Sequence, residues 1–504
     1  MLKYIKETLK NSFIYSIGNV FVKLTGFILI PFLTNPEYLS VDDFGAFVVL
    51  EAVNQIVITV MGLGLYNSLI RWYYDQTEEE NKATFFTSSV LIGCLVLLIS
   101  LVTFSFKAEV SDILLDTTIY QDMVVLVMIS TGLQALGVLP ATLMRMQEKA
   151  TFFTVTNIIK LVATLLITLY LLFKIDNGLF AIYIGQIAGF AIYLVILIPY
   201  MLKNSTLRIH IPVLTEMMGY GFSMMMSAIA VASTNVIDRL VLNSMSGLEQ
   251  AGLYSLGFKV SSLIKVFIIT SVSMALTPLI FKKMKDNDSH RFYQKSMTYY
   301  GFGIMICIMG VSLFGKEVLK LVTGSALYWS SFTVIPILAF GMYFVALSDI
   351  ASIGIRIKKK TSRITLMTAI VSVLNLALNI LLIPLLGTEG AAFASLFSHL
   401  VFFSGLFYFS NKMYPIAFEW RKVILMFALG AILVYGSLLT TNMDLIVRLL
   451  VKTSAIISFP VILYFFNFYE DAELRQIKTL WLQWRNPLRW KENFKRILHH
   501  TTNH

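Results

Sequence analysis

The sequence predicts an all-α integral membrane protein of about fourteen transmembrane helices, with two six-helix lobes in parallel repeat and two further helices after them. Its 504 residues are 57% hydrophobic and only 14% charged, with a mean hydropathy of +0.75, whereas a typical soluble domain is about 25% charged. Apolar runs of roughly twenty residues recur along the chain, and each is long enough to cross a hydrocarbon layer ~30 Å thick. An internal repeat supplies the third observation.

The apolar runs place the predicted helices in order. The first run follows the charged start MLKYIKETLK. It is too long for the core of a secretory signal and no small-residue cleavage site follows it, so we expect a retained helix. The predicted segments are 12–33, 44–66, 84–106, 120–143, 150–173, 178–201, 217–244, 253–280, 296–315, 330–355, 363–386, 389–410, 422–440 and 445–466.

The repeat defines the expected domains. DDFGAFVVLEAVNQIV (42–57) aligns with EQAGLYSLGFKVSSLI (249–264), and KIDNGLFAIYIGQIAGF (174–190) aligns with LGTEGAAFASLFSHLVF (386–402) at nearly the same offset. Because six is even, both halves enter the membrane in the same direction, and a substrate site is expected between them. The predicted parts are an N-terminal lobe, a C-terminal lobe, two additional helices and a basic cytoplasmic tail, at 1–205, 206–412, 413–466 and 467–504.

Basic residues set the expected orientation, because the cytoplasmic face retains Lys and Arg. With the N-terminus inside, most of the 40 Lys and Arg fall in inside loops and tails. The outside loops hold only Lys107, Lys174, Lys316 and Lys320. We therefore expect both termini in the cytoplasm. The basic inside loops account for most of the net charge of +11, so this charge does not indicate a nucleic-acid partner. The basic loops are expected to anchor the topology first and to contact anionic membrane lipids second.

Five basic residues inside the predicted helices are candidate substrate-binding groups: Lys23, Lys160, Arg239, Lys259 and Lys265. A charge near the bilayer centre costs ~2.5–3.5 kcal/mol on insertion scales and usually faces a wet cavity or a partner. Snorkelling to an interface explains one or two of them. The Ser, Thr and Asn residues at helical spacing around them have an alternative interpretation as helix–helix contacts.

Acidic residues lie beside these bases. Asp238 and Arg239 cannot pair with each other, because adjacent helical residues point about 100° apart. We expect Arg239 to face the passage and Asp238 to meet a lysine of segment 253–280. Glu51, Asp238 and His399 are the candidate carriers of a coupling ion, since titratable groups in a low-dielectric cavity have easily shifted pKa values. A salt-bridged acid and a packed histidine are the alternatives.

A basic cavity attracts an anion, and for cargo with a greasy body the natural anion is a lipid phosphate or pyrophosphate. Arg grips such a group with two hydrogen bonds, whereas Lys acts as a point charge.

Several segments resemble the bacterial polysaccharide transporter family, the flippases of O-antigen and other repeat-unit lipids. This family belongs to the multidrug/oligosaccharidyl-lipid/polysaccharide exporter superfamily. The segments are LTNPEYLSVDDFGAF (33–47), NVIDRLVLNSMSGLEQAGLYSLGFKVSSLI (235–264) and GTEGAAFAS (387–395). The resemblance covers essentially the whole chain.

The resemblance implies a protein of the bacterial cytoplasmic (inner) membrane. It would flip undecaprenyl-pyrophosphate-linked oligosaccharide repeat units to the outer leaflet by alternating access, for surface polysaccharide such as lipopolysaccharide. It maps the family's basic cavity residues onto Lys23, Arg239, Lys259 and Lys160, with Arg71 of NSLIRWYYD at the cytoplasmic mouth. A coupling ion (H+ or Na+), a glycan polymerase and glycosyltransferases are the further candidate partners.

The sequence argues against an enzyme. It contains no P-loop, nucleophile elbow or metal-spaced His/Cys cluster, so we expect no cofactor, no metal and no catalytic residue. A glycan polymerase or ligase would need a sizeable outside loop for its reactive residues. An ion-coupled multidrug exporter of the same superfamily remains the alternative, although its cationic cargo favours a carboxylate-rich cavity. A non-transporting assembly scaffold would have no reason for polar stripes across the membrane.

Overall fold

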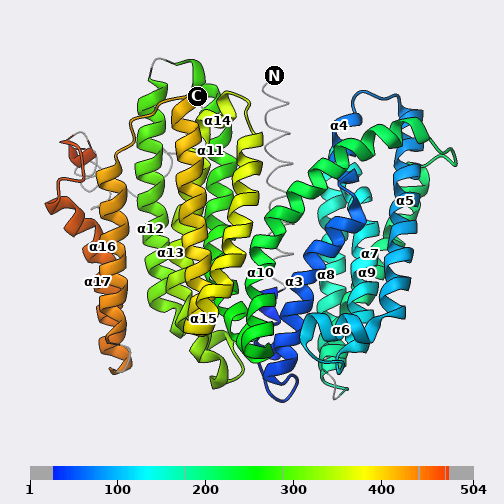
Figure 1. The fold of residues 1–504 in the computed structure, drawn as a ribbon, viewed down its shortest axis with the longest axis horizontal. Helices are drawn as coiled ribbons and strands as arrows, with labels where there is room; N and C mark the ends of the chain where they lie inside the picture. The colour runs from blue at the N-terminus through cyan, green and yellow to red at the C-terminus, as the bar shows by residue number, and fades with distance from the viewer. Residues whose placement is uncertain (1–25, 176–177, 287, 441–442, 472, 476–504) are drawn as a thin grey trace, which may run out of the picture. The chain divides into compact units, whose positions relative to one another are not determined.

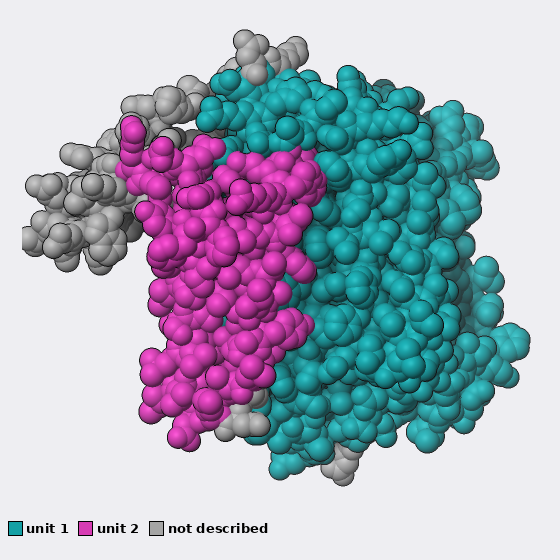
Figure 2. Space-filling view, turned by 60° about the vertical axis from the view of Figure 1, so that its left-hand side comes forward, with its two compact units in different colours: residues 1–417 teal, residues 418–504 magenta. Residues whose placement is uncertain are grey.

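The structure, a computed structural model, describes residues 26–475 apart from 176–177, 287, 441–442 and 472. The chain divides into two compact units, residues 1–417 and 418–504, which Figure 2 colours separately. All regular structure among the described residues is helical, and eleven of the described helices are long and apolar enough to cross a membrane. The protein is therefore an all-α integral membrane protein, as predicted.

The helices of the first unit follow the predicted order (Figure 1). They are α2 (Ile30–Leu33), α3 (Val41–Gly62), α4 (Leu65–Trp72), α5 (Glu78–Ser105), α6 (Lys107–Leu115), α7 (Gln121–Met146), α8 (Ala150–Leu172), α9 (Gly178–Lys203), α10 (Ile211–Leu263), the π-helical turn η1 (Ile264–Ile269), α11 (Thr270–Lys282), η2 (Lys283–Lys285), α12 (Ser289–Val322), η3 (Ala326–Phe332), α13 (Val334–Ala351), α14 (Ile353–Ile357) and α15 (Ser362–Met413). In the second unit, α16 (Trp420–Leu438) and α17 (Leu445–Phe465) pack against each other.

Local sequence explains where α3 begins and ends. Ser40 Oγ accepts the Asp43 N–H at 3.1 Å, and Asp43 Oδ2 accepts the Ser40 N–H at 3.2 Å. This reciprocal cap satisfies backbone donors that have no partner within the helix. The helix ends where Leu63 and Gly64 adopt positive φ angles of 45° and 66°. The predicted segment 44–66 therefore corresponds to α3, which ends a few residues earlier than expected and is followed by the short helix α4.

Two long helices each contain a sharp break at a glycine. In α10 the break is Gly247 (φ 87°, ψ 169°), and in α15 it is Gly387 (φ 58°, ψ −132°). These angles are accessible to glycine because it lacks a Cβ. We call residues 211–246 and 248–263 the first and second arms of α10. The first predicted segment lies mostly in residues 1–25, outside the described part of the chain, so the count of fourteen stays a prediction.

The helix α10 links two groups of helices in the first unit (Figure 1). Near its start, the Met217 carbonyl accepts the Ser68 hydroxyl of α4 at 2.7 Å. Further along, the Ala230 carbonyl accepts the Ser372 hydroxyl of α15 at 2.8 Å. The packing of α10 against α3 and α15 is extensive. The finer division into lobes at 1–205 and 206–412, and the boundaries proposed after them, stay predictions.

Candidate functional site

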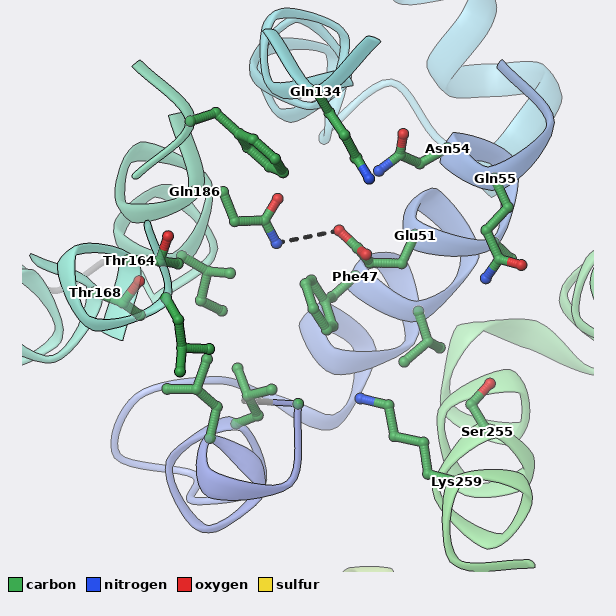
Figure 3. Close-up of a pocket in the computed structure, with 18 of the residues that line it drawn as sticks. Phe47, Glu51, Asn54, Gln55, Gln134, Thr164, Thr168, Gln186, Ser255 and Lys259 are labelled. Atoms are coloured by element: carbon green, nitrogen blue, oxygen red, sulfur yellow. Dashed lines mark hydrogen bonds between the residues drawn. The ribbon is translucent and has the colours of Figure 1, made fainter. Parts of the chain in front are cut away.

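A cavity of about 400 Å³ is lined by α3, α7, α8, α9, both arms of α10 and the segment around α2 (Figure 3). Its size lies within the ~300–1,000 Å³ typical of small-molecule sites. Apolar side chains such as Phe47 and Phe190 alternate with polar ones. The polar lining residues are Glu51, Asn54, Gln55, Gln134, Lys160, Thr164, Thr168, Gln186, Arg239, Ser255 and Lys259.

The two arms of α10 supply a cationic wall, which we define as Arg239 and Lys259. Arg239 is only 8% exposed. Its Nε donates to Ser255 Oγ at 3.0 Å, and its guanidinium lies 4.8 Å from the ring centre of Phe258. These contacts come from the second arm, so the break at Gly247 brings the Arg239 and Lys259 helices face to face. Lys259 Nζ lies 5.6 Å from the ring centre of Phe47.

A third cation enters from α8. Lys160 Nζ donates to Asn157 Oδ1 at 2.9 Å and lies 5.1 Å and 4.8 Å from the ring centres of Phe190 and Tyr193. Aromatic faces stabilise an ammonium group without neutralising it. The Lys160 amine therefore lies beside the cavity, against two aromatic rings.

The helices α3, α7 and α9 supply a different surface, the amide wall, which carries one carboxylate. Its residues are Asn54, Gln55, Gln134 and Gln186 together with Glu51. Gln186 Nε2 donates to Glu51 Oε1 at 3.2 Å, the bond drawn in Figure 3. Glu51 and Lys259 approach the middle of the cavity from different sides.

Asp238 lies in a separate buried cluster, outside the cavity lining. It is 1% exposed. It accepts hydrogen bonds from Tyr254 Oη at 2.5 Å, Asn379 Nδ2 at 2.7 Å and Ser395 Oγ at 2.6 Å. The expectation that Asp238 meets a lysine of segment 253–280 is therefore wrong, because that segment supplies Tyr254 as its hydrogen-bond partner. Helical geometry turns Asp238 toward α15 while the neighbouring Arg239 faces the cavity.

Two other predicted site residues lie outside the cavity lining. Lys265 is exposed in the π-helical turn η1. His399 of α15 lies beside α13, where a Cβ placed on Gly341 would be 3.1 Å from its Nδ1. The structure thus brings together Glu51, Lys160, Arg239 and Lys259, but it does not bring Lys265 or His399 to them.

Of the two remaining predicted basic residues, the structure describes Arg71 but not Lys23. Arg71 of α4 is exposed, forms an ion pair with Asp75 and lies 5.8 Å from the ring centre of Trp72. Lys23 lies outside the described residues.

Sequence reasoning missed Gln134, Gln186 and Ser255 as lining residues. Each is an uncharged polar residue inside an apolar run, and selecting sites by charge passed over them. Amides within a membrane segment are a usable signal, since a buried amide needs hydrogen-bond partners. Among the described residues, no group of three or more His, Cys, Asp and Glu side chains could hold a metal ion.

The chain is thus a multi-pass membrane protein whose helices enclose a polar cavity. The fold is similar to the lipid II flippase MurJ in an inward closed conformation, with a TM-score of 0.73 and 15% identity over 90% of this chain and 99% of that one. It is also similar to an inward-facing multidrug resistance MATE family transporter of the MOP superfamily (TM-score 0.61, 11% identity, 82% and 94% of the chains). A third similar structure is the MATE multidrug transporter DinF-BH (TM-score 0.60, 14% identity, 82% and 96%).

The chain belongs to the polysaccharide biosynthesis protein family, whose model matches residues 8–284. No curated protein matches the sequence. The solved neighbours are transporters and a flippase rather than enzymes. At 11–15% identity they establish the fold; the family match connects that fold to polysaccharide synthesis.

Proposed function

We propose that the protein is a flippase for lipid-linked oligosaccharide. It moves undecaprenyl-pyrophosphate-linked repeat units from the inner to the outer leaflet of the bacterial cytoplasmic membrane by alternating access, for surface polysaccharide biosynthesis. A glycan polymerase and glycosyltransferases are its proposed functional partners. The family match and the likeness to MurJ support this proposal.

The cationic wall is the observation that carries the proposal. Arg239 and Lys259 meet in a cavity within an apolar helix bundle, and Lys160 adds a third charge. Cations are costly at membrane depth, so their grouping favours an anionic ligand. A pyrophosphate joined to a long lipid fits both the charge and the surrounding bilayer. Lys23 belongs to the proposed substrate-binding set by its resemblance to the family pattern, with Arg71 near the cytoplasmic mouth.

An ion-coupled multidrug exporter is the second candidate, and the likeness to MATE transporters supports it. The described cavity lining carries Lys160, Arg239 and Lys259 against the single carboxylate of Glu51. A cationic drug would be repelled by this balance of charge. We therefore prefer the anionic lipid substrate.

The proposed orientation puts both termini in the cytoplasm. Alkaline phosphatase joined after Thr388 should be active, because that site follows the Gly387 break on the proposed outer side. A fusion after Lys360 or at the C-terminus should be inactive. The reverse pattern would contradict the orientation.

Asp238 is our preferred candidate for ion coupling, ahead of Glu51 and His399. The hydroxyl oxygens of Tyr254 and Ser395 contact the Asp238 carboxylate directly. The side-chain oxygen of Asn375 lies one residue further away, because Asn379 Nδ2 contacts both it and Asp238. Such a cluster suits H+ or Na+. Transport by Asp238→Asn should lose its dependence on an imposed gradient of the coupling ion. Unaltered gradient dependence in Asp238→Asn would rule the site out.

Arg239 gives the direct test of the flippase function. In a strain lacking the protein, lipid-linked glycan should accumulate on the cytoplasmic side, and the wild-type chain should relieve this. The Arg239→Ala variant should clear this glycan from the cytoplasmic side at least about tenfold more slowly than the wild type, because a desolvated charge-assisted contact is lost. Arg239→Lys should retain partial transport, since it keeps the charge but loses the paired hydrogen bonds.

Membrane abundance separates a substrate contact from a structural role. The matched control is Arg421→Ala, on the exposed face of α16 outside the cavity lining, which should transport normally. If Arg239→Ala transports normally at normal abundance, the proposed substrate site is wrong. If it fails only in proportion to lost protein, Arg239 is structural.

A further inference from the structure

We infer that the amide wall is a sugar subsite, which recognises the sugar next to the phosphate while the cationic wall holds the phosphate itself. This inference rests on the proposed function and assigns the opposite side of the same cavity. The subsite consists of Asn54, Gln134 and Gln186 with Glu51, and Gln55 lies at its edge. Its ligand class is a hydroxyl-bearing pyranose.

The amide wall is held in place by a second row of hydroxyl groups behind it. Ser130 Oγ donates to Gln186 Oε1 at 3.1 Å, and Thr131 Oγ1 lies 2.7 Å from Asn54 Oδ1. Both α7 hydroxyl residues are 1% exposed. Ser130 fixes the Gln186 amide, whose oxygen accepts from Ser130 while its Nε2 donates to Glu51. The Thr131 hydroxyl also lies 2.7 Å from the Val127 carbonyl oxygen, and its single proton serves one acceptor, so Asn54 keeps one end of its amide for a ligand.

The remaining hydrogen-bonding capacity includes both donors and acceptors. Gln134 makes no side-chain hydrogen bond among the described residues, so both ends of its amide are available, and Figure 3 draws it pointing toward Asn54 and Glu51. Glu51 retains its second carboxylate oxygen. A sugar hydroxyl donates and accepts at once, so it can use such a mixed set. A phosphate oxygen accepts only, so it cannot use the acceptors.

Glu51 determines which wall takes the phosphate. A carboxylate repels a phosphate strongly in a poorly screened site, but it makes a strong charge-assisted hydrogen bond with a hydroxyl. The cationic wall, Arg239 and Lys259, has the opposite preference. The two walls therefore orient a sugar phosphate across the cavity. A volume of about 400 Å³ suits this end of the lipid-linked glycan rather than a long oligosaccharide.

Two probe lipids test the subsite with the full-length protein in nanodiscs: polyprenyl diphosphate, and polyprenyl diphosphate carrying a single hexose. The wild type should bind the hexose lipid at least about tenfold more tightly than bare polyprenyl diphosphate, a difference that corresponds to two or three net hydrogen bonds. Gln134→Leu and Gln186→Leu should lose most of this preference while binding bare polyprenyl diphosphate as before. Glu51→Gln, which is nearly isosteric, should bind the bare lipid more tightly and the hexose lipid less tightly.

Controls separate failure of the subsite from failure of the proposed function. Gln121→Leu removes an amide from the same helix α7 outside the cavity lining, and it should keep the wild-type preference. Arg239→Ala should weaken both lipids together. Equal affinity of the wild type for the two lipids, or equal weakening of both by the amide variants, would overturn the sugar subsite alone. If neither lipid binds the wild type, the proposed flippase function fails.

Discussion

The first unit is held together differently at the two ends of α3. Near the start of α3, a Cβ on Gly45 would lie 2.1 Å from the carbonyl oxygen of Leu248, just after the α10 break; we call this the Gly45 contact. Beyond the end of α3, a Cβ on Gly64 would lie 2.1 Å from the carbonyl oxygen of Gly221 in the first α10 arm; we call this the Gly64 contact. Both contacts require backbone-to-backbone approach, which only glycine permits.

The Gly45 contact involves more elements and excludes water. The Phe44 and Tyr328 rings meet edge to face with centres 5.4 Å apart, and both side chains are 0% exposed. Burial, followed by the nearby Asp43 carboxylate, raises the pKa of Tyr328, so its phenol stays neutral. The Gly324 N–H also donates to Thr34 Oγ1 at 2.8 Å. Four segments thus share this contact.

The Gly64 contact depends on one arm of α10. The Ser68 hydroxyl bonds to the Met217 carbonyl, and the Trp72 and Tyr220 ring centres lie 5.7 Å apart. Neighbouring side chains on α10 are solvent- or lipid-exposed, such as Phe222 at 56%. Leu65, Leu69 and Met217 are nevertheless buried there at 0–1% exposure, so a local opening would move the α10 arm with its exposed flanks rather than α4. We expect the cavity to open more readily at the Gly64 contact, which is the cytoplasmic end in the proposed orientation.

The largest expected effect comes from Gly45→Leu. The added side chain collides with the Leu248 backbone, and overpacking costs about 1–3 kcal/mol, so the Gly45 contact should be forced open. A cavity reporter, Thr164→Cys in a chain lacking Cys94 and Cys307, should then react several-fold faster with a membrane-impermeant maleimide added outside. Gly93→Leu is the control, since a Cβ there meets nothing within 4 Å. Unchanged outside labelling would show that this contact does not close the cavity.

A smaller effect is expected from Gly221→Val. A Cβ there would lie 2.6 Å from the Leu63 carbonyl oxygen, but the exposed surroundings give the helix room to shift. The reporter should label faster from the cytoplasmic side in inverted vesicles, with partial transport retained. Gly219→Val is a closely matched control on the same helix, where a Cβ meets nothing within 4 Å. If Gly219→Val has the same effect, helix propensity rather than the contact is responsible.

The smallest effect is expected from Ser68→Ala. It removes one hydrogen bond to Met217, worth about 0.5–1.5 kcal/mol, so cytoplasmic labelling of the reporter should rise modestly and outside labelling should stay unchanged. Ser227→Ala serves as the control, because that hydroxyl bonds within its own helix to the Ser223 carbonyl at 3.1 Å. A rise in outside labelling for Ser68→Ala would contradict the assignment of the two ends.

The fold was largely predictable because apolar length and glycine chemistry are local properties. Hydrophobic runs located the long helices, and the separations between segments 217–244 and 253–280 and between 363–386 and 389–410 fall at the breaks of Gly247 and Gly387. The predicted segment 44–66 corresponds to α3, and its end is displaced, because the positive φ angles at Leu63 and Gly64 leave little trace in hydropathy.

The site was less predictable because the facing of each side chain depends on helix packing. Helical periodicity predicts that the Asp238 and Arg239 side chains point in different directions. It does not predict that Asp238 accepts hydrogen bonds from Tyr254, Asn379 and Ser395. Lys265 follows Lys259 by six residues, and at about 100° per residue it points about 120° away from Lys259 around the helix. Charge alone selected candidates, so the neutral amides were passed over.

The glycine breaks at 247 and 387 also bear on how the protein is made. Each joins two antiparallel helices through a turn of only a few residues, such as SGLEQ at the first break and GTEG at the second, so the membrane-insertion machinery has only a short stretch of hydrophilic chain to carry across. Both helices of such a pair are synthesised in immediate succession, and their mutual contacts are local in sequence, which favours rapid association. These hairpins therefore suit insertion as preassembled pairs.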